Sequence, residues 1–217
     1  MKNKNFLSIE TSLSRIFLVL GFKETVSSIN KLVSNSIEIE LNVLISEILL
    51  ISKIKFSDLN FILVSLGPGS YTGARVGLAA AKAIAMSLNI PLLGYSNFEA
   101  IYFQAKLNNL ILENDELGFV IRANKKELYY QKYRKKIKNE KNVMSIVSLI
   151  SLSRKNNFPY MIIGNVKLEL SFNNYIYCMP QEESLILVFQ YLYKDFLEGQ
   201  SKDLEPYYVN GHYAKKK

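Results

Sequence analysis

The sequence has one cysteine, one histidine and no tryptophan among its 217 residues. A single cysteine, Cys178, excludes an internal disulfide and a thiolate metal cluster. Its apolar neighbours in YIYCMP favour an inert core thiol over a nucleophile. The only histidine, His212, lies in the tail YVNGHYAKKK, which argues against a two-histidine metal site and a histidine-activated nucleophile in the core. Most hydrolase mechanisms are therefore disfavoured.

The sequence also lacks a run of about 18 apolar residues, the length that a membrane-spanning helix needs. Ser8, Glu10 and Thr11 interrupt the first apolar stretch, which fits neither a spanning helix nor a signal peptide. Apolar residues make up 49% of the chain, which is enough for a sizeable core. We therefore expect a globular, cytoplasmic protein with no membrane partner.

Positive charge exceeds negative charge, with a formal net charge of +8. Lysines concentrate between Lys132 and Lys141 and at residues 215–217. Such runs are usually solvated surface, but lysines near phosphates also gain from counterion release. Direct contact of these lysines with RNA therefore stays open.

The first half of the chain alternates between strand and helix patterns. Strands are expected at 6–10, 15–22, 25–33, 60–66 and 91–95, and helices at 37–52, 74–88 and 97–106. In the second half we expect strands at 119–122, 127–133 and 160–164, and helices at 143–152 and 184–197. This order predicts an α/β fold with a mixed sheet covered by helices, in two lobes at 1–106 and 107–217.

A glycine-rich stretch, GPGSYTG, precedes the helix expected at 74–88. It departs from the phosphate-binding G-x-x-x-x-G-K-[ST] and G-x-G-x-x-G patterns by its spacing and by Ala74 in the lysine position. Two interpretations stay open, a tight structural turn and an anion-binding loop at a helix start. The loop residues concerned are Gly67, Gly69, Ser70, Thr72 and Gly73. Glu10 and Thr11, at the end of the first strand, could approach a phosphate or a hydrated cation.

Two of the expected helices are apolar nearly all round, and a helix of this kind needs cover on both sides. In the helix at 74–88 only Arg75 and Lys82 carry charge, and the helix at 37–52 has a second apolar line opposite the first. A partner's helices would supply the missing cover, unless helices of the second lobe fold back over them. The residues expected at such an interface are Leu41, Leu44, Ile45, Ile48, Arg75, Ala79, Ala80, Lys82, Ala83 and Met86.

The segment LGPGSYTGARVGLAAAKAIA, preceded by SDLNFILVS and followed by IPLLGYSNFEAI, resembles the TsaB family, a branch of the actin-like ATPase superfamily that is paralogous to TsaD. FLSIETS, VIRANKKELYYQKY, MIIGN and EPYYVNGHY resemble further motifs of that family. The resemblance implies an actin-like ATPase (ribonuclease H-like) fold with a mixed sheet, flanking helices and a second lobe that is smaller or degenerate.

The resemblance also implies a function in threonylcarbamoyl transfer to the adenosine beside the anticodon of tRNAs that read codons starting with A. The chain would be a non-catalytic subunit bound to a TsaD-like paralogue, which carries the metal ion and transfers the group. A TsaE-like ATPase joins them, and tRNA is reached through the complex. No cofactor is then expected on this chain, because ATP and a metal ion are expected in the partner subunits. We also expect the isolated chain to form a homodimer.

Several positions depart from the family's usual residues, namely Glu10, Ile37, Arg122, Asn124 and Asn165. These departures weaken the case for a nucleotide or ion contact. An autonomous actin-like phosphotransferase, with ATP held by Glu10 and the turn 67–73, is the alternative function. A metallopeptidase is a third hypothesis, and the sequence offers it too few ligands.

Overall fold

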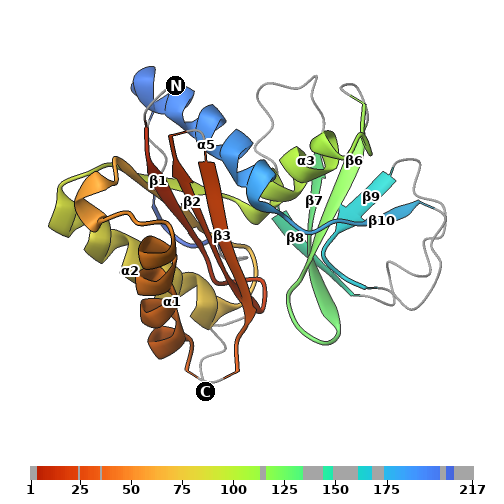
Figure 1. The fold of residues 1–217 in the computed structure, drawn as a ribbon. Coiled ribbons are helices and arrows are strands. Elements are labelled where there is room, and N and C mark those ends of the chain that lie inside the picture. The colour runs from red at the N-terminus through yellow and green to blue at the C-terminus, as the bar shows by residue number, and fades with distance from the viewer. Residues whose placement is uncertain are drawn as a thin grey trace.

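A computed structural model describes residues 4–23, 25–34, 36–112, 116–133, 144–148, 161–167, 174–200 and 204–207. The chain forms two five-stranded sheets with helices packed against them (Figure 1). No helix in the described part of the chain is both long enough and apolar enough to cross a bilayer.

The first sheet has the strand order β3-β2-β1-β4-β5. Its members are β1 (Phe6–Glu10), β2 (Arg15–Phe22), β3 (Thr25–Leu32), β4 (Phe61–Ser65) and β5 (Leu92–Tyr95). The first three strands form an antiparallel meander, and β4 and β5 run parallel to β1. Strands β1 and β4 are buried along their whole length, because helices cover both faces of this sheet.

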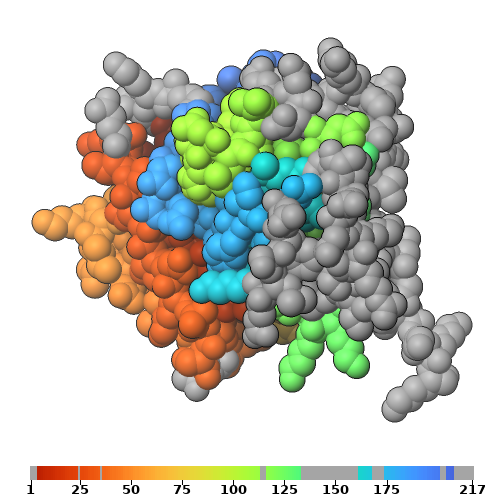
Figure 2. Space-filling view, turned by 90° about the vertical axis from the view of Figure 1, so that its right-hand side faces the viewer, coloured from red at the N-terminus to blue at the C-terminus, as the bar shows by residue number. Residues whose placement is uncertain are grey.

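Helices α1 (Ile37–Ile51) and α2 (Tyr71–Leu88) pack on one face of the first sheet, against side chains such as Leu7 and Ile9. Helix α5 (Glu182–Leu197) packs on the other face, where Phe189 contacts Phe6 at 4.4 Å between ring centroids. Helix α3 (Asn97–Leu107) lies beside α5 and faces the second sheet. Figure 2 shows α5 (blue) between β3 (red-orange) and α3 (yellow-green). A short 3₁₀ turn, η1 (Phe56–Asp58), precedes β4.

The second sheet has the strand order β10-β9-β6-β7-β8. Its members are β6 (Leu117–Arg122), β7 (Glu127–Tyr133), β8 (Met144–Ser148), β9 (Met161–Gly164) and β10 (Tyr175–Tyr177). Strands β6, β7 and β8 form an antiparallel meander, while β9 and β10 run parallel to β6. The second sheet thus repeats the topology of the first, and the predicted actin-like ATPase fold is confirmed.

The structure differs from the expected elements and lobes in several ways. The helix predicted at 143–152 is wrong, because 144–148 form strand β8 paired with β7. Strand β10 was not predicted. The boundary between 106 and 107 does not separate the lobes as predicted, because α5 and the segment 204–207 return to the first sheet, where the Tyr207 N–H donates to the Leu66 carbonyl at 2.8 Å.

Candidate functional site

The glycine-rich loop joins β4 to α2 and is packed onto the turn between β1 and β2. Helix α2 begins at Tyr71, a turn earlier than predicted, because Ser70 caps it by accepting a hydrogen bond from the Gly73 N–H at 3.3 Å. The Ser70 N–H donates to the Ser12 carbonyl at 2.7 Å, and the Thr11 hydroxyl donates to the Gly73 carbonyl at 2.6 Å. Loop, helix start and turn therefore form one hydrogen-bonded unit.

The glycines of this loop are required by close backbone approach. A Cβ at Gly69 would overlap the carbonyl oxygen of Ser12, and one at Gly73 would overlap that of Thr11. Gly67 adopts a φ of +88°, in the left-handed region that glycine tolerates. The glycines thus meet the steric needs of a tight turn, and anion binding by the loop stays a prediction.

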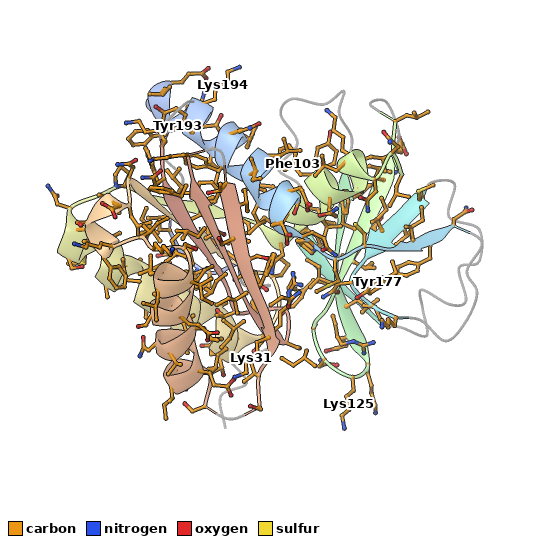
Figure 3. The ribbon with its side chains drawn as sticks, viewed as in Figure 1. Lys31, Phe103, Lys125, Tyr177, Tyr193 and Lys194 are labelled. Carbon is orange, nitrogen blue, oxygen red and sulfur yellow. The ribbon has the colours of Figure 1, made fainter. Side chains whose placement is uncertain are left out.

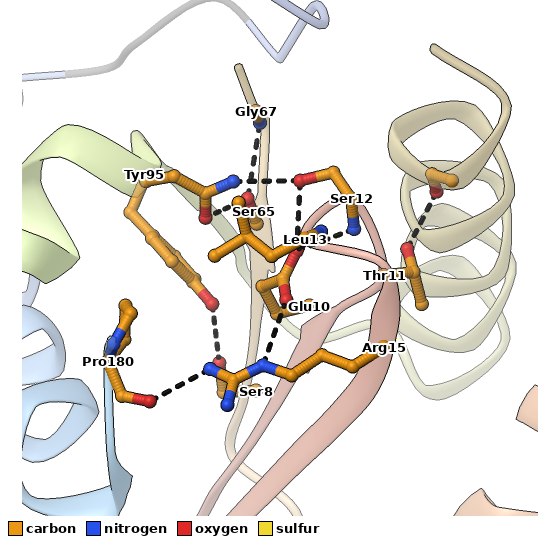
Figure 4. Close-up of polar contacts among 12 residues, drawn as sticks. Ser8, Glu10, Thr11, Ser12, Leu13, Arg15, Ser65, Gly67, Tyr95 and Pro180 are labelled. Carbon is orange, nitrogen blue, oxygen red and sulfur yellow. Dashed lines mark hydrogen bonds and ion pairs between the residues drawn. The ribbon is translucent and has the colours of Figure 1, made fainter. Parts of the chain in front are cut away.

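Glu10 ends β1 with its carboxylate directed inward (Figure 4). Its Oε1 accepts hydrogen bonds from the Ser12 N–H at 2.5 Å, the Ser12 hydroxyl at 2.9 Å and the Leu13 N–H at 3.0 Å. The backbone donors that could hold an anion at this turn are thus taken by the chain itself. Glu10 is 1% exposed and Thr11 is 3% exposed, and the predicted nucleotide contact of these two residues stays a prediction.

Arg15 is the buried counter-charge of Glu10. Its Nε lies 3.7 Å from Glu10 Oε2, and its Nη2 donates a hydrogen bond to the Pro180 carbonyl at 2.8 Å. Burial raises the pKa of Glu10, partly offset by Arg15, and burial lowers the pKa of Arg15, partly offset by Glu10. Pro180 lies just ahead of α5, so this pair connects β1 and β2 to the segment that leads into that helix.

Asn97, the first residue of α3, completes the polar cluster. Its Nδ2 donates to the Ser12 hydroxyl at 2.7 Å and to the Pro68 carbonyl at 2.9 Å, and its Oδ1 accepts from the Ser65 hydroxyl at 2.7 Å. Asn97 is fully buried. Sequence reasoning missed Asn97 and Arg15, and the available signal was only that Ser96 and Glu99 form a capping box around the helix start. The cluster holds the first lobe together and presents no reactive group to solvent.

The interface prediction is corrected for four residues of α1. Leu41, Leu44, Ile45 and Ile48 are at most 4% exposed, because they fill the layer between α1 and the first sheet. They cannot contact a partner directly. The second apolar line of α1 is the exposed one: Ile39, Val43 and Leu50 are 68%, 59% and 79% exposed.

The predicted residues of α2 lie at the surface. Arg75, Ala79, Lys82 and Ala83 are exposed, Ala80 is half-buried, and Met86 is 81% exposed. Helices α1 and α2 are neighbours on the same face of the first sheet, and α5, the described helix of the second lobe, lies on the other (Figure 1). The second-lobe helices thus do not cover this surface in the described part of the chain. We call it the helical face and define it by Ile39, Val43, Leu50, Ala79, Ala83 and Met86.

No group of three or more histidine, cysteine or acidic side chains that could hold a metal ion occurs within the described ranges. Cys178 is 3% exposed, and burial raises the pKa of its thiol to about 11, which confirms the core-thiol interpretation. His212, the lysines at 215–217 and most of the basic run after Lys132 fall outside the described residues.

The positions that depart from the usual family residues have structural roles here. Ile37 begins α1 and packs against the core of the first lobe. The Arg122 N–H donates to Asn165 Oδ1 at 3.1 Å, which links the ends of β6 and β9. Asn124 Oδ1 accepts from the Lys126 N–H at 2.8 Å and shapes the turn between β6 and β7.

Comparison with known proteins supplies the family context. The family model of TsaD, tRNA N6-adenosine threonylcarbamoyltransferase, matches residues 29–180, more than half of the chain. The chain is 29% identical over 119 residues to the tRNA threonylcarbamoyladenosine biosynthesis protein TsaB of Buchnera aphidicola from Schizaphis graminum, with 52% of this chain and 57% of that protein aligned. It is also 29% identical over 138 residues to TsaB of Haemophilus influenzae, with 63% of this chain and 57% of that protein aligned.

The alignments thus span little more than half the length of these curated relatives. Among solved structures, YeaZ from Pseudomonas aeruginosa superposes with a TM-score of 0.71 at 16% identity, covering 95% of this chain and all of that one. A likeness at this identity concerns the fold alone.

Proposed function

We propose a role in tRNA modification for this chain, because it belongs to the TsaD family of tRNA N6-adenosine threonylcarbamoyltransferases. Its relatives TsaB of Buchnera aphidicola and Haemophilus influenzae are named for biosynthesis of tRNA threonylcarbamoyladenosine. In the proposed role the chain is a non-catalytic subunit that binds a TsaD-like paralogue. The paralogue transfers the threonylcarbamoyl group to the adenosine next to the anticodon.

The observation that carries this proposal is the exposed helical face. Ile39, Val43, Leu50 and Met86 all have more than half of their surface in water, on two adjacent helices. Large apolar side chains exposed on two neighbouring helices are typical of a protein interface. Small exposed residues, Ala79 and Ala83, let a partner helix approach closely between the larger side chains.

The glycine-rich loop packs against the chain's own backbone, which supports the proposal that the chain has no catalytic activity of its own. Glu10 is held by its own turn, and the loop lies against the backbone of Ser12. We infer that Glu10 and the loop stabilise the fold and take no part in phosphoryl transfer. ATP and the metal ion then belong to the partner subunits, which include a TsaE-like ATPase, and tRNA is reached through the assembly.

The test is a calorimetric titration of the chain with its TsaD-like paralogue. Val43→Asp and Ala83→Asp would each place an unpaired carboxylate in the interface, and burial of one unpaired charge costs about 3 kcal/mol or more. We expect the dissociation constant to rise at least about 100-fold for each variant. Leu197→Asp is the matched control, because Leu197 is 66% exposed on α5, away from the helical face.

If both helical-face variants bind the paralogue as tightly as the parent chain does, the interface lies elsewhere on the chain. A parent chain that forms no complex with the paralogue would refute the proposed subunit role altogether.

A further inference from the structure

We infer that the second sheet carries a contact surface for the RNA backbone, at the edge where its parallel strands end. This inference deepens the proposed function and rests on it, because it names the part of the chain that meets the tRNA. We call the surface the basic edge and define it by Arg122, Lys125, Lys126, Lys167 and Tyr177.

The topology of the second sheet brings these residues to one edge. Strands β6, β9 and β10 run parallel, with Val120 beside Gly164 and Gly164 beside Tyr177. Arg122 ends β6, and Lys167 follows β9 by three residues. The turn between β6 and β7 carries Lys125 and Lys126 at the same edge, and Lys125 points away from both sheets in Figure 3. In Figure 2 this turn (light green) projects from the lower rim of the molecule.

The cations of the basic edge are exposed, and none of the four forms an ion pair in the part of the chain that the structure describes. Some other lysines are paired with a carboxylate, such as Lys132, whose Nζ lies 3.0 Å from Glu116 Oε2. The carboxylate within the turn, that of Glu127, accepts a hydrogen bond from Asn124 Nδ2 at 2.6 Å. Like charges gathered without internal partners repel each other and create a positive potential that attracts an anion.

The turn that carries two of the lysines is held in a fixed shape. Asn124 Oδ1 accepts from the N–H groups of Lys126 at 2.8 Å and Glu127 at 3.0 Å, and the Ala123 N–H donates to the Glu127 carbonyl at 3.0 Å. The backbone at Lys125 and Lys126 is therefore ordered before any ligand arrives, which lowers the entropy cost of binding.

The arrangement fits a polyanion better than a small anion. The four cations come from two segments along an edge, the β6–β7 hairpin and the segment after β9, and a chain of phosphates can meet them in succession. Tyr177 is 46% exposed, and Lys167 Nζ lies 5.8 Å from the centroid of its ring. An exposed ring beside cations is a platform on which an unpaired base can stack. A membrane offers negative charge but no base, so RNA is the favoured partner.

The test measures binding of a fluorescently labelled, unmodified tRNA transcript by anisotropy, with the full chain at 50 to 200 mM KCl. The test variant combines Arg122→Gln, Lys125→Gln, Lys126→Gln and Lys167→Gln. The matched control combines Lys4→Gln, Lys23→Gln, Lys53→Gln and Lys55→Gln, which removes the same charge from exposed positions of the first lobe.

We expect the test variant to bind tRNA at least tenfold more weakly at the lowest salt concentration. The slope of log affinity against log salt should fall by up to about 3, the value for four lost phosphate contacts on a single strand. The control should lose less than threefold. Equal losses in both variants, or no loss in the test variant, would overturn the inference, as would stronger binding to phosphatidylserine vesicles than to tRNA.

Complex formation with the TsaD-like paralogue is measured on the same preparations. The basic edge lies on the second lobe, so the test variant should keep its affinity for the paralogue. If the parent chain fails to bind the paralogue, the proposed function is refuted, while the tRNA titration of the chain alone still decides whether the basic edge contacts RNA.

Discussion

Two charged residues at the junction of the two lobes, Glu10 and Arg15, are almost fully buried. Glu10 and Arg15 are 1% and 5% exposed, and their facing atoms, Oε2 and Nε, make no hydrogen bond with another described residue. A buried pair of this kind adds little net stability, but removal of one partner leaves an uncompensated charge. The pair therefore fixes how β2 meets the segment before α5 rather than serving as a reactive centre.

Arg15→Met should lower the free energy of unfolding by about 3 kcal/mol at pH 7, measured by urea denaturation. The loss should depend on pH. Burial raises the pKa of Glu10 and Arg15 lowers it, so the variant has a still higher pKa at Glu10. A carboxyl group with a folded pKa above its unfolded value of about 4.3 stabilises at lower pH and loses that contribution as pH rises through the folded pKa.

Relative to the parent chain, Arg15→Met should therefore lose more free energy of unfolding at pH 8 than at pH 4. The double variant Arg15→Met/Glu10→Gln carries no charge at this site, so its own free energy of unfolding should lack the contribution of Glu10 to the pH dependence, and at pH 8 it should be more stable than Arg15→Met. A deficit of Arg15→Met that stays equal across this range would show that Glu10 does not titrate there.

At the scale of single elements, two glycines of α2 let this helix pack closely on β1 and the turn that follows it. Gly73 faces the Thr11 carbonyl, and Gly77 faces the Thr11 hydroxyl and Ile9. In an exposed helix, glycine is worse than alanine by up to about 1 kcal/mol, so both positions accept that cost for close contact with β1 and its turn. The small residues of α2 are thus divided between two sides, with Ala81 and Ala85 buried against the sheet and Ala79 and Ala83 in solvent.

Gly77→Ala should destabilise the chain by about 1 to 3 kcal/mol, because the new Cβ overlaps the Thr11 hydroxyl. The Thr11→Ala background removes that oxygen, so the same substitution should there be neutral or stabilising, as thermal unfolding would show. Gly73→Ala provides the contrast, since its Cβ meets the backbone carbonyl of Thr11, which Thr11→Ala leaves in place. If Thr11→Ala rescued both variants equally, the packing explanation would fail.

At the scale of the whole molecule, two surfaces with different chemistry lie on different lobes. The apolar helical face belongs to α1 and α2, and the basic edge belongs to the second sheet. A subunit built this way can bind a protein partner through one lobe while the other lobe remains accessible to nucleic acid. Because the helical face is uncovered within the described chain, we expect the isolated protein to self-associate.

The isolated chain should form a homodimer through the helical face, detectable by sedimentation equilibrium at micromolar concentration. Val43→Asp should raise the dimer dissociation constant at least tenfold, because each dimer would then bury a carboxylate from each protomer. Addition of the TsaD-like paralogue should convert the homodimer to a heterodimer, since both would use one surface. If the homodimer persists while the paralogue is bound to it, the two contacts lie on separate surfaces of the chain.

The sequence by itself determined most elements of the first lobe and the presence of the glycine-rich turn. Period-two and period-3.6 patterns predict β1, β2, α1 and β4 correctly, because each buries one continuous apolar surface. The family resemblance supplied the fold, which the repeated sheet topology confirms. The sequence also showed that α1 has two opposite apolar lines, without deciding which of them faces the core.

Only the tertiary structure decided which side of each helix faces the core and what the loop contacts. An isolated helix that is apolar all round has two equivalent sides, and Leu41 and Ile45 could not be told from Ile39 and Val43 until the sheet was in place. Strand β8 was predicted as helix because a short apolar run fits both periods, and pairing with β7 settles it. Long-range contacts such as Asn97 to Ser12 and Arg15 to Pro180 depend on chain segments that only folding brings together.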